Sequence, residues 1–401
     1  MKKLISRKPY LDQLKMWREE ELIKVVTGVR RCGKSTLFEL YIDYLKEIGV
    51  SNEQIIYINL EDEDLSELFD HRKLHEYIKS RILKNGKWMY LFIDEIQNCV
   101  EYERAIASLY LKKNLDIYIT GSNAYMLSGE LATKLTARYV EINMLNLSFS
   151  EFGEVVTTSD KRERFNQFMN MGSFPYSTRL VDNSLVHSQY LEGIFNTVLV
   201  KDVMTREGLK DISLVKSIAG FLASSVGSPI SAKKIADTLT SSGRPTGSAT
   251  VDKYLTAFSD AYLFYKVNRY DIRGKMHLKS ECKYYCCDTG LRNMILGTSN
   301  KDIGHQIENI VYLELLRRGY IVNIGKSGRG TEIDFIAVRN RRTEYYQVSA
   351  TVLDENTLSR ELEPLKQIKD NYPKFLITLD DYITNYNGIE QFNLIDWLLM
   401  E

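Results

Sequence analysis

Eight residues near the start of the chain have the types and spacing of a phosphate-binding loop, Gly28-Val29-Arg30-Arg31-Cys32-Gly33-Lys34-Ser35. The two glycines let the backbone curl so that its N–H groups face phosphate oxygens. Lys34 can reach the β and γ phosphates of a nucleotide, and Ser35 can ligate Mg²⁺. Together with Thr36, these residues form the predicted nucleotide-binding set.

The flanking sequence supplies the elements that this loop requires. Residues 22–27 are mostly apolar and predict a short buried strand directly before the loop. Apolar residues then recur at helical spacing, which places a helix N-terminus and its favourable dipole at the phosphate site. They are Leu37, Leu40, Tyr41, Tyr44 and Leu45. The alternative is a plain glycine turn before a helix.

A second motif follows some 60 residues later. Residues 89–93 predict an apolar strand that ends in Asp94 and Glu95. Asp94 would hold Mg²⁺ through water, as in P-loop ATPases generally. Glu95 is then placed to polarise the attacking water as a general base. The alternative is a strand followed by an acidic helix start.

A third strand is predicted at residues 115–120, and it ends in Gly121, Ser122 and Asn123. In P-loop ATPases with an additional strand, a polar residue here lies between the two motifs and contacts the γ-phosphate or its water. Ser122 or Asn123 can do so in this chain. A simple Ser or Asx turn is the alternative.

These motifs, in this order, resemble the prokaryotic AAA-type P-loop ATPases that carry a C-terminal domain of unknown function. The resemblance extends over essentially the whole chain and includes the strings at residues 28–35, 91–97, 120–123, 147–152, 172–175 and 201–202. It implies an ATP-binding protein that hydrolyses ATP slowly with Mg²⁺, in a homo-oligomer or as a switch. It also implies an AAA-type domain over residues 1–210, with a helical lid at about 146–210.

Two residues near the loop carry separate expectations. Arg138 is the candidate that stabilises charge on the transferring phosphate, in cis or from a neighbouring subunit, with Arg206 as a second candidate. The alternative is a solvated arginine beside a strand. A helix N-terminus should lower the pKa of Cys32, so that its oxidation could block phosphate entry, although a passive cysteine is the favoured interpretation.

Residues 211–300 predict a winged helix-turn-helix domain. Two short helices, at residues 231–239 and around 251–258, flank a glycine-containing turn, and a strand follows at 262–267. The segment holds 12 basic and 7 acidic side chains, which suits duplex DNA. Ser248, Thr250 and Lys253 would face the DNA, with Arg244 near the backbone. A protein-docking role stays open.

Residues 301–401 predict an α-β-β-β-α-β order that resembles the PD-(D/E)-x-K nuclease fold. Glu308 and Asp334 match two of its carboxylates, but Gln347 and Ser349 stand where that fold has Glu and Lys. Lys366 is a possible migrated lysine. The segment is acidic, with 12 basic and 16 acidic side chains, and therefore repels a DNA backbone. An inactive nuclease-like α/β domain is the favoured interpretation.

Composition bounds the remaining choices. The chain has 401 residues with 53 basic and 53 acidic side chains, enough for two to four α/β domains but not for a uniformly basic nucleic-acid binder. Five cysteines and no long apolar run favour a cytoplasmic protein without a membrane segment or signal peptide. We therefore expect an ATPase that repositions DNA- or protein-contacting domains. The alternatives are an ATP-regulated DNA endonuclease using Glu308 and Asp334, and a non-hydrolysing adaptor for a protein partner.

Overall fold

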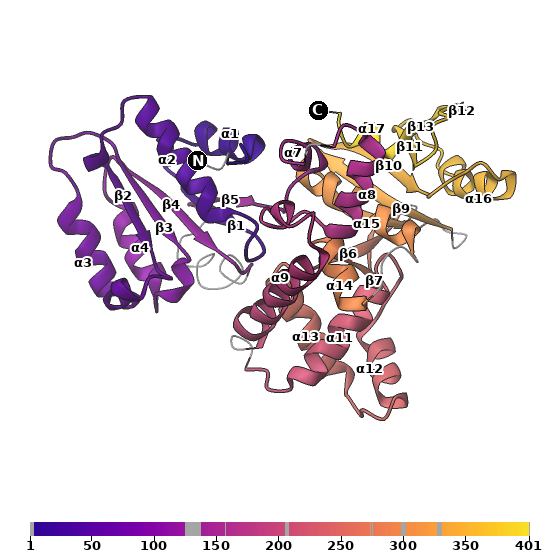
Figure 1. Ribbon diagram of the computed structural model, residues 1–401, viewed down its shortest axis with the longest axis horizontal. Helices are drawn as coiled ribbons and strands as arrows, with labels where there is room; N and C mark the ends of the chain where they lie inside the picture. Colours follow the sequence, from indigo (N-terminus) through magenta and orange to yellow (C-terminus); the bar gives the residue numbers. More distant parts are fainter. Residues whose placement is uncertain are drawn as a thin grey trace. The chain divides into compact units, whose positions relative to one another are not determined.

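The computed structural model describes residues 4–124, 138–156, 158–204, 208–272, 274, 276–297, 302–326 and 331–400. The chain divides into two compact units (Figure 1). The first comprises residues 1–145 and 260–262, and the second comprises residues 146–259 and 263–401. The domain boundaries expected near 210 and 300 do not coincide with this division, which instead falls at the expected start of the lid, near 146. No unit boundary falls near 300 because strands before that residue join the same sheet as those after it.

The first unit is a parallel α/β sandwich. Its strands pair in the order β2-β3-β4-β1-β5, and each pairing is parallel. The strands are β1 (Ile23–Thr27), β2 (Ile55–Asn59), β3 (Met89–Asp94), β4 (Leu115–Gly121) and β5 (Tyr139–Asn143). The helices are α1 (Lys8–Met16), α2 (Lys34–Glu47), α3 (His71–Arg81) and α4 (Tyr102–Tyr110), joined by short 3-10 turns at Asn52–Gln54, Glu63–Phe69 and Ile96–Asn98.

Successive side chains of the central strands point to opposite faces of the sheet and are apolar on both, which explains why helices cover both faces. One face of β3 and β4 packs Leu91, Ile93, Ile117 and Ile119 against apolar residues of α3 and α4. The opposite face presents Phe92 to the α2 rings, with ring centroids 5.2 Å from Phe38. Because every residue of β1, β3 and β4 is buried, these strands form the core that fixes the loops at their carboxyl ends.

Helices make up the first part of the second unit. They are α7 (Phe149–Gly153), α8 (Lys161–Met171), α9 (Ser184–Thr197), α11 (Ile212–Ser224), α12 (Ala232–Ser241), α13 (Ser248–Asp260) and α14 (Thr289–Leu296). A 3-10 turn covers Ser177–Arg179, and a π-helical segment, Val198–Met204, follows α9. The predicted helix at 231–239 is α12, whose N-terminal N–H groups are capped by Ser231.

A mixed sheet of eight described strands forms the rest of this unit, in the order β12-β13-β11-β10-β9-β8-β6-β7. Its strands are β6 (Phe264–Asp271), β7 (Met276–Cys286), β8 (Ile321–Lys326), β9 (Glu332–Arg339), β10 (Arg342–Val348), β11 (Lys374–Thr378), β12 (Asn385–Tyr386) and β13 (Ile389–Asn393). The helices α15 (Ile303–Arg317), α16 (Glu355–Lys366) and α17 (Leu394–Trp397) accompany it.

The predicted element order of the last hundred residues is present as α15-β8-β9-β10-α16-β11. The β6–β7 hairpin extends this sheet because β6 pairs in parallel with β8. The nuclease-like assignment itself stays a prediction. Within the described residues, no helix has both the length and the apolar character needed to cross a membrane.

Candidate functional site

The loop between β1 and α2 has the backbone shape expected of a phosphate cradle. Gly28, Arg31 and Gly33 have φ angles of 145°, 72° and 105°, all in the region that favours glycine. A Cβ on Gly28 would lie 2.2 Å from the carbonyl oxygen of Met144, so no side chain fits there. Left-handed residues in such a turn direct successive N–H groups to one side, which is the geometry that binds an anion.

Lys34 lies at the first turn of α2, and its side chain is folded back over the loop. Its Nζ donates to the carbonyl oxygens of Gly28 at 3.1 Å and Val29 at 3.4 Å. The same Nζ is 3.6 Å from Oε1 of Glu95. These partners are weak enough to be exchanged for a phosphate, which would offer the ammonium group full negative charge.

Ser35 and Asp94, the predicted metal ligands, are joined by a side-chain hydrogen bond. Asp94 ends β3, and its other contacts come from the hydroxyl groups of Thr120 and, at 3.3 Å, Tyr57. Burial raises the pKa of Asp94, and the hydrogen bonds from Ser35 and Thr120 oppose that rise. A hydroxyl and a carboxylate in contact beside the phosphate loop are oxygen donors of the kind that Mg²⁺ prefers.

Glu95 is held at the edge of the site by several donors. Its side chain accepts a hydrogen bond from Gln97, and Arg30 lies 3.9 Å away. Burial alone would raise the pKa of Glu95, but the charges of Lys34 and Arg30 outweigh it and hold the pKa below its ordinary value. An ionised carboxylate beside the loop can accept a proton from water.

The third motif lies where the sequence predicts it. Strand β4 pairs with both β1 and β3, so Ser122 and Asn123 follow the strand between the two motifs. Both residues are buried. Gln97 donates to the Ser122 hydroxyl at 3.4 Å, which links this strand end to Glu95.

The remaining loop residues have different surroundings. Val29 is buried, Arg31 is exposed and Thr36 is half-buried. Arg30 forms an ion pair with Glu61 at 2.6 Å. The expectation for Cys32 is wrong, because burial raises the pKa of its thiol and the charge of Lys34 only partly offsets this. The thiol is fully buried, which leaves it without the solvent access that oxidation requires.

Arg138 does not lie at the loop. It immediately precedes β5, and its carbonyl oxygen accepts a hydrogen bond from Ile23 N, at the start of β1. The loop follows the other end of β1, so Arg138 is at the opposite edge of the sheet. Its guanidinium group lies over the ring of Tyr110 instead. Arg138 is therefore not placed to stabilise charge on a phosphate bound to the loop of its own chain. Arg206, the second candidate, lies outside the described residues.

Sequence reasoning missed three residues that shape the site. Thr120 donates to the Asp94 carboxylate, and its Oγ1 accepts the backbone N–H of Glu95 at 2.9 Å, so it holds the Asp94 side chain and the Glu95 backbone. Tyr57 approaches Asp94 from β2, a strand that carries none of the three motifs. Arg7 is buried and donates to the Cys32 carbonyl at 2.8 Å. Only Thr120, which lies in a recognised string, left a signal in the sequence.

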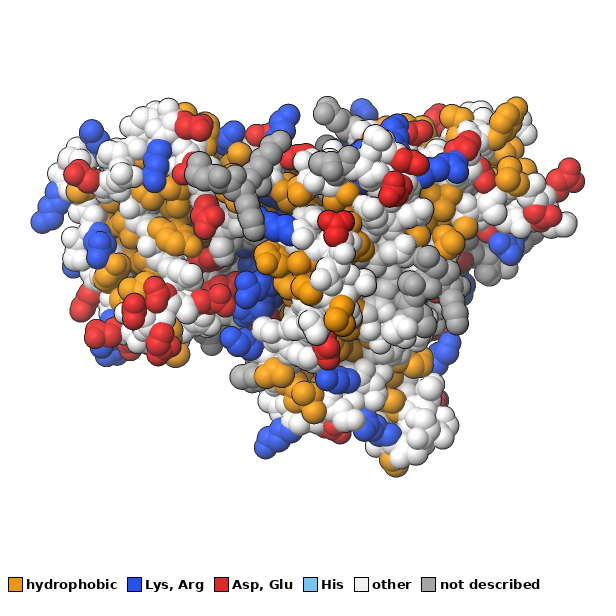
Figure 2. All heavy atoms as spheres, in the orientation of Figure 1, with side chains coloured by type: hydrophobic (Ala, Val, Ile, Leu, Met, Phe, Trp, Pro, Cys, Tyr) orange, Lys and Arg blue, Asp and Glu red, His pale blue; other side chains and the backbone are white. Residues whose placement is uncertain are grey.

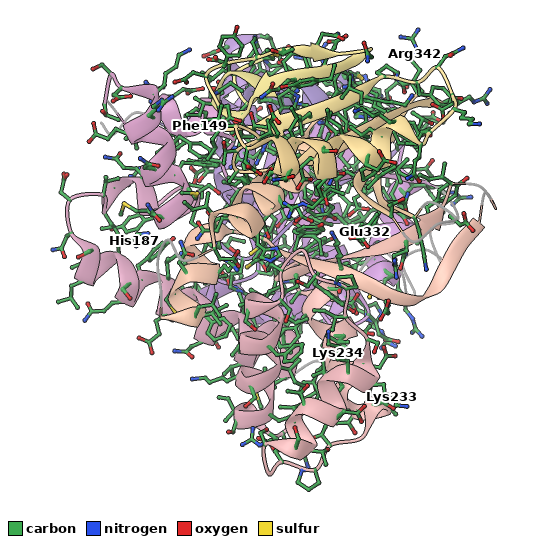
Figure 3. The ribbon with its side chains drawn as sticks, turned by 90° about the vertical axis from the view of Figure 1, so that its right-hand side faces the viewer. Phe149, His187, Lys233, Lys234, Glu332 and Arg342 are labelled. Atoms are coloured by element: carbon green, nitrogen blue, oxygen red, sulfur yellow. The ribbon has the colours of Figure 1, made fainter. Side chains whose placement is uncertain are left out.

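A second group of acidic residues lies in the second unit. Glu308 on α15 and Asp334 on β9 meet around the ammonium group of Lys283, which comes from β7. The Lys283 Nζ is 2.8 Å from Glu332, 3.0 Å from Glu308 and 3.7 Å from Asp334. Figure 3 labels Glu332 beside the β6–β7 hairpin. We refer to these four residues as the Lys283 cluster.

The Lys283 cluster changes the expectation for the nuclease-like domain. The lysine among the carboxylates is Lys283, whereas the side chain of Lys366 on α16 is exposed. Gln347 contacts both the Asp334 N–H and Glu361. Among the described residues, no group of three or more His, Cys, Asp or Glu side chains has the arrangement of a metal site.

Comparisons with known proteins agree with the first unit's fold. A family model described as an AAA domain matches residues 20–153, and a model described as a domain of unknown function (DUF8612) matches residues 162–302. The AAA match covers the phosphate loop and all five strands of the first sheet.

Full-length relatives occur in both bacteria and archaea. An uncharacterized protein of Haemophilus influenzae is 42% identical over 404 residues, covering 99% of each chain. An uncharacterized protein of Methanocaldococcus jannaschii is 31% identical, covering 95% of this chain and 90% of its own. The structure of the Aeropyrum pernix ORC1 protein in complex with DNA aligns with a TM-score of 0.31 and 11% identity, covering 74% of this chain and 93% of that one. This chain belongs to the family of the two full-length relatives, and it carries an AAA-type P-loop ATPase domain.

Proposed function

We propose that the chain binds Mg·ATP at residues 28–36 and hydrolyses it. The observation that carries this proposal is the meeting of Lys34, Ser35, Asp94 and Glu95 at the carboxyl edge of one parallel sheet. Each group has the chemistry that phosphoryl transfer needs, namely a cation for the phosphates, oxygen donors for a metal and an ionised base.

Glu95 is the base in this proposal. Its carboxylate would accept a proton from the water whose oxygen attacks the γ-phosphorus, while the bond to the β-phosphate oxygen breaks and ADP leaves. Before this step, when ATP binds, Lys34 would exchange its carbonyl partners for phosphate oxygens. Mg²⁺, held by Ser35 and through water by Asp94, would supply charge for the β and γ phosphates. Ser122 and Asn123 would orient the γ-phosphate or its water.

Steady-state phosphate release from Mg·ATP tests this proposal. Wild type is compared with Lys34→Ala and Glu95→Gln, each with and without duplex DNA, and nucleotide binding is measured in parallel. Both variants should lose turnover, and Glu95→Gln should still bind ATP because it retains the phosphate contacts. ATP binding without turnover by wild type under every condition would support the non-hydrolysing adaptor instead.

The nucleotide state would reposition the parts that follow the AAA domain, from a helical segment at residues 146–210 onward. This action, the cytoplasmic location and assembly into a homo-oligomer belong to the proposal. The endonuclease alternative is not favoured. The Lys283 ammonium lies among the carboxylates that a nuclease would use for Mg²⁺ and already offsets one of their charges.

Contact with duplex DNA through α11–α13 is a second candidate function. One observation favours it, an open and shallow surface along α12 that Lys233 and Lys234 line together with Asp237. Figure 3 shows both lysines near the free end of this helical region. Ser248, Thr250 and Lys253 are exposed on α13, so these side chains are accessible to a DNA duplex. Arg244, which was expected near the DNA backbone, instead donates hydrogen bonds to the hydroxyl groups of Ser213 and Ser217 on α11.

Fluorescence anisotropy with a labelled random-sequence duplex tests this second candidate. On the face that Figure 2 shows, the Lys and Arg side chains of this region are scattered rather than gathered in one stripe, so we expect weak, salt-sensitive binding. Lys233→Glu with Lys234→Glu should remove it, whereas Lys73→Glu, on an exposed helix of the first unit, should not. If the double variant still binds the duplex, the α12 surface is not the DNA-binding surface.

A further inference from the structure

A three-residue segment from late in the chain belongs to the first unit. Asp260, Ala261 and Tyr262 pack with the AAA sheet, although they follow its last strand by more than 100 residues. The segment ends α13 and leads directly into β6, so the chain passes through the first unit between two elements of the second.

The side chain of Tyr262 reaches the residue that precedes the phosphate loop both through Glu141 and by side-chain hydrogen bonding with Thr27 itself, and it also contacts Asn143. Its hydroxyl donates to Oε1 of Glu141, on β5, at 3.2 Å. The hydroxyl of Thr27 donates to the same oxygen at 2.7 Å. Thr27 is the last residue of β1 and directly precedes Gly28. Burial, followed by the charge of Glu141, raises the pKa of Tyr262, so its hydroxyl remains a donor at all ordinary pH values.

The backbone of the segment is also tied to the site. The carbonyl oxygen of Asp260 accepts a hydrogen bond from Ala124 N at 2.8 Å, directly after Ser122 and Asn123. Tyr262 has a φ angle of 54°, a left-handed conformation that costs a residue with a side chain about 1–2 kcal/mol. Such a conformation persists only where the surrounding contacts impose it, and these positions cluster at functional sites.

We propose that Tyr262 is a positioning residue for the phosphate loop, acting through Glu141 and Thr27. Through it, the Asp260–Tyr262 segment transmits the nucleotide state to α13 and β6. This inference rests on the proposed function, because it requires that the loop binds nucleotide.

The shared acceptor supplies the physical link. A ligand shifts a conformational equilibrium only through interactions that differ between the two states. Phosphate binding acts on the backbone from Gly28 onward, and any displacement of Thr27 changes its hydrogen bond to Glu141. Because Glu141 Oε1 accepts from both hydroxyl groups, that change alters the hydrogen bond from Tyr262. The hydrogen bond to Glu141 is one of the contacts that hold the Tyr262 backbone in its left-handed conformation, so strengthening or weakening this bond changes how firmly that conformation is held.

Hydrogen exchange on the full chain, with and without Mg²⁺ and a non-hydrolysable ATP analogue, tests this inference. In wild type, the nucleotide should change exchange in peptides that cover residues 248–271. Tyr262→Phe removes only the hydroxyl, so nucleotide affinity should stay within about three-fold, since the phosphate contacts are intact, while the change at 248–271 should be lost. Tyr382→Phe, on a side chain that is 79% exposed, is the matched control and should respond as wild type does.

A second pair of variants tests the same link from its other side. Glu141→Gln keeps an acceptor oxygen and should retain the nucleotide-dependent change in exchange. Glu141→Ala removes the acceptor and should lose that change. This pair tests the inference even if Tyr262→Phe does not fold. A normal response in either Tyr262→Phe or Glu141→Ala would overturn the inference. Wild type that binds and hydrolyses ATP without any change at 248–271 would overturn it while the proposed function stands. Wild type that binds no nucleotide would overturn both.

Discussion

The phosphate-loop site and the Lys283 cluster each combine one buried lysine with carboxylates, but their charges are arranged differently. Lys34 has two carbonyl partners and one carboxylate at 3.6 Å. Lys283 has three carboxylates within 3.7 Å, two of them at 3.0 Å or less. The first lysine can exchange its partners for a phosphate. The second is already neutralised by fixed carboxylates, so exchanging them would leave buried charges unpaired.

This difference shows what separates a ligand site from an internal ion pair. At the loop, β1, β3 and β4 bring the groups to one sheet edge while Ser35 remains exposed to solvent. In the Lys283 cluster, the charged groups satisfy one another, and Tyr285 adds a hydrogen bond to Glu308 at 2.6 Å. Residue types alone do not distinguish the two arrangements. The number of fixed partners per charge does.

The largest expected effect is the loss of ATP turnover in Lys34→Ala. Removing a group that stabilises charge in the transition state typically costs about 10²–10³-fold in rate, and we expect phosphate release to fall by at least that amount. Lys283→Met should keep turnover near the wild-type rate in the same assay, because its partners are carboxylates of the second unit. Comparable losses in both variants would contradict the distinction between the two lysines.

For Lys283, we expect the main effect of substitution to be on the stability of the fold rather than on ATP turnover. Lys283→Met leaves buried carboxylates without their cation, so the free energy of unfolding of the second unit should fall by about 3–5 kcal/mol. Urea denaturation followed by tyrosine and tryptophan fluorescence measures this. Lys366→Met, on an exposed side chain of α16, is the control and should change little. Adding Glu308→Gln to Lys283→Met should restore part of the loss, and no restoration would show that packing rather than charge dominates.

A more gradual effect should appear in the pH dependence of stability. Burial and the charge of Glu308 raise the pKa of Asp334 to about 8 in the folded chain, against an ordinary value near 4. Between these two values the folded state holds the proton more strongly, so stability should fall as pH rises from about 5 to 8, by about 1.4 kcal/mol per pH unit at most. It should level off above the folded pKa.

Asp334→Asn provides the comparison for that pH dependence, because it cannot ionise. The difference between wild type and Asp334→Asn should diminish as pH falls, when both side chains are neutral. Urea midpoints at pH 5, 7 and 9 measure this difference. Parallel pH profiles for the two proteins would mean that Asp334 is ionised throughout.

Local pattern predicted the elements of the loop site well, because strand, loop and helix are consecutive in the chain. The pairing between strands that are distant in the sequence could not be predicted in this way. Lys24 lies inside the predicted strand at 22–27, yet its side chain is fully buried against Asp116 at 2.6 Å. That contact depends on the register of β1 against β4, which no local periodicity encodes.

The same limit explains the misplaced lysine of the second unit. The sequence offers Lys366, on the helix after β10, as a possible migrated lysine. Lys283 instead comes from a hairpin whose first strand, β6, pairs in parallel with β8 more than 50 residues later. The position of Glu308 and Asp334 could be predicted from helix and strand patterns. Their cation could not, because it depends on the topology of the whole sheet.

The smallest expected effect concerns Arg138 and tests the geometry of the first unit directly. Arg138 precedes β5, whose first residue pairs with Ile23, while the loop follows Thr27. A strand rises about 3.3 Å per residue, so roughly 16 Å of sheet separates Arg138 from the loop. Arg138→Ala should therefore leave ATP turnover within about two-fold at low protein concentration, far from the 10²–10³-fold cost of losing a contact to the reacting phosphate. A loss of turnover that grows with protein concentration would instead assign Arg138 to the site of a neighbouring subunit, since only an assembled neighbour could bring it there.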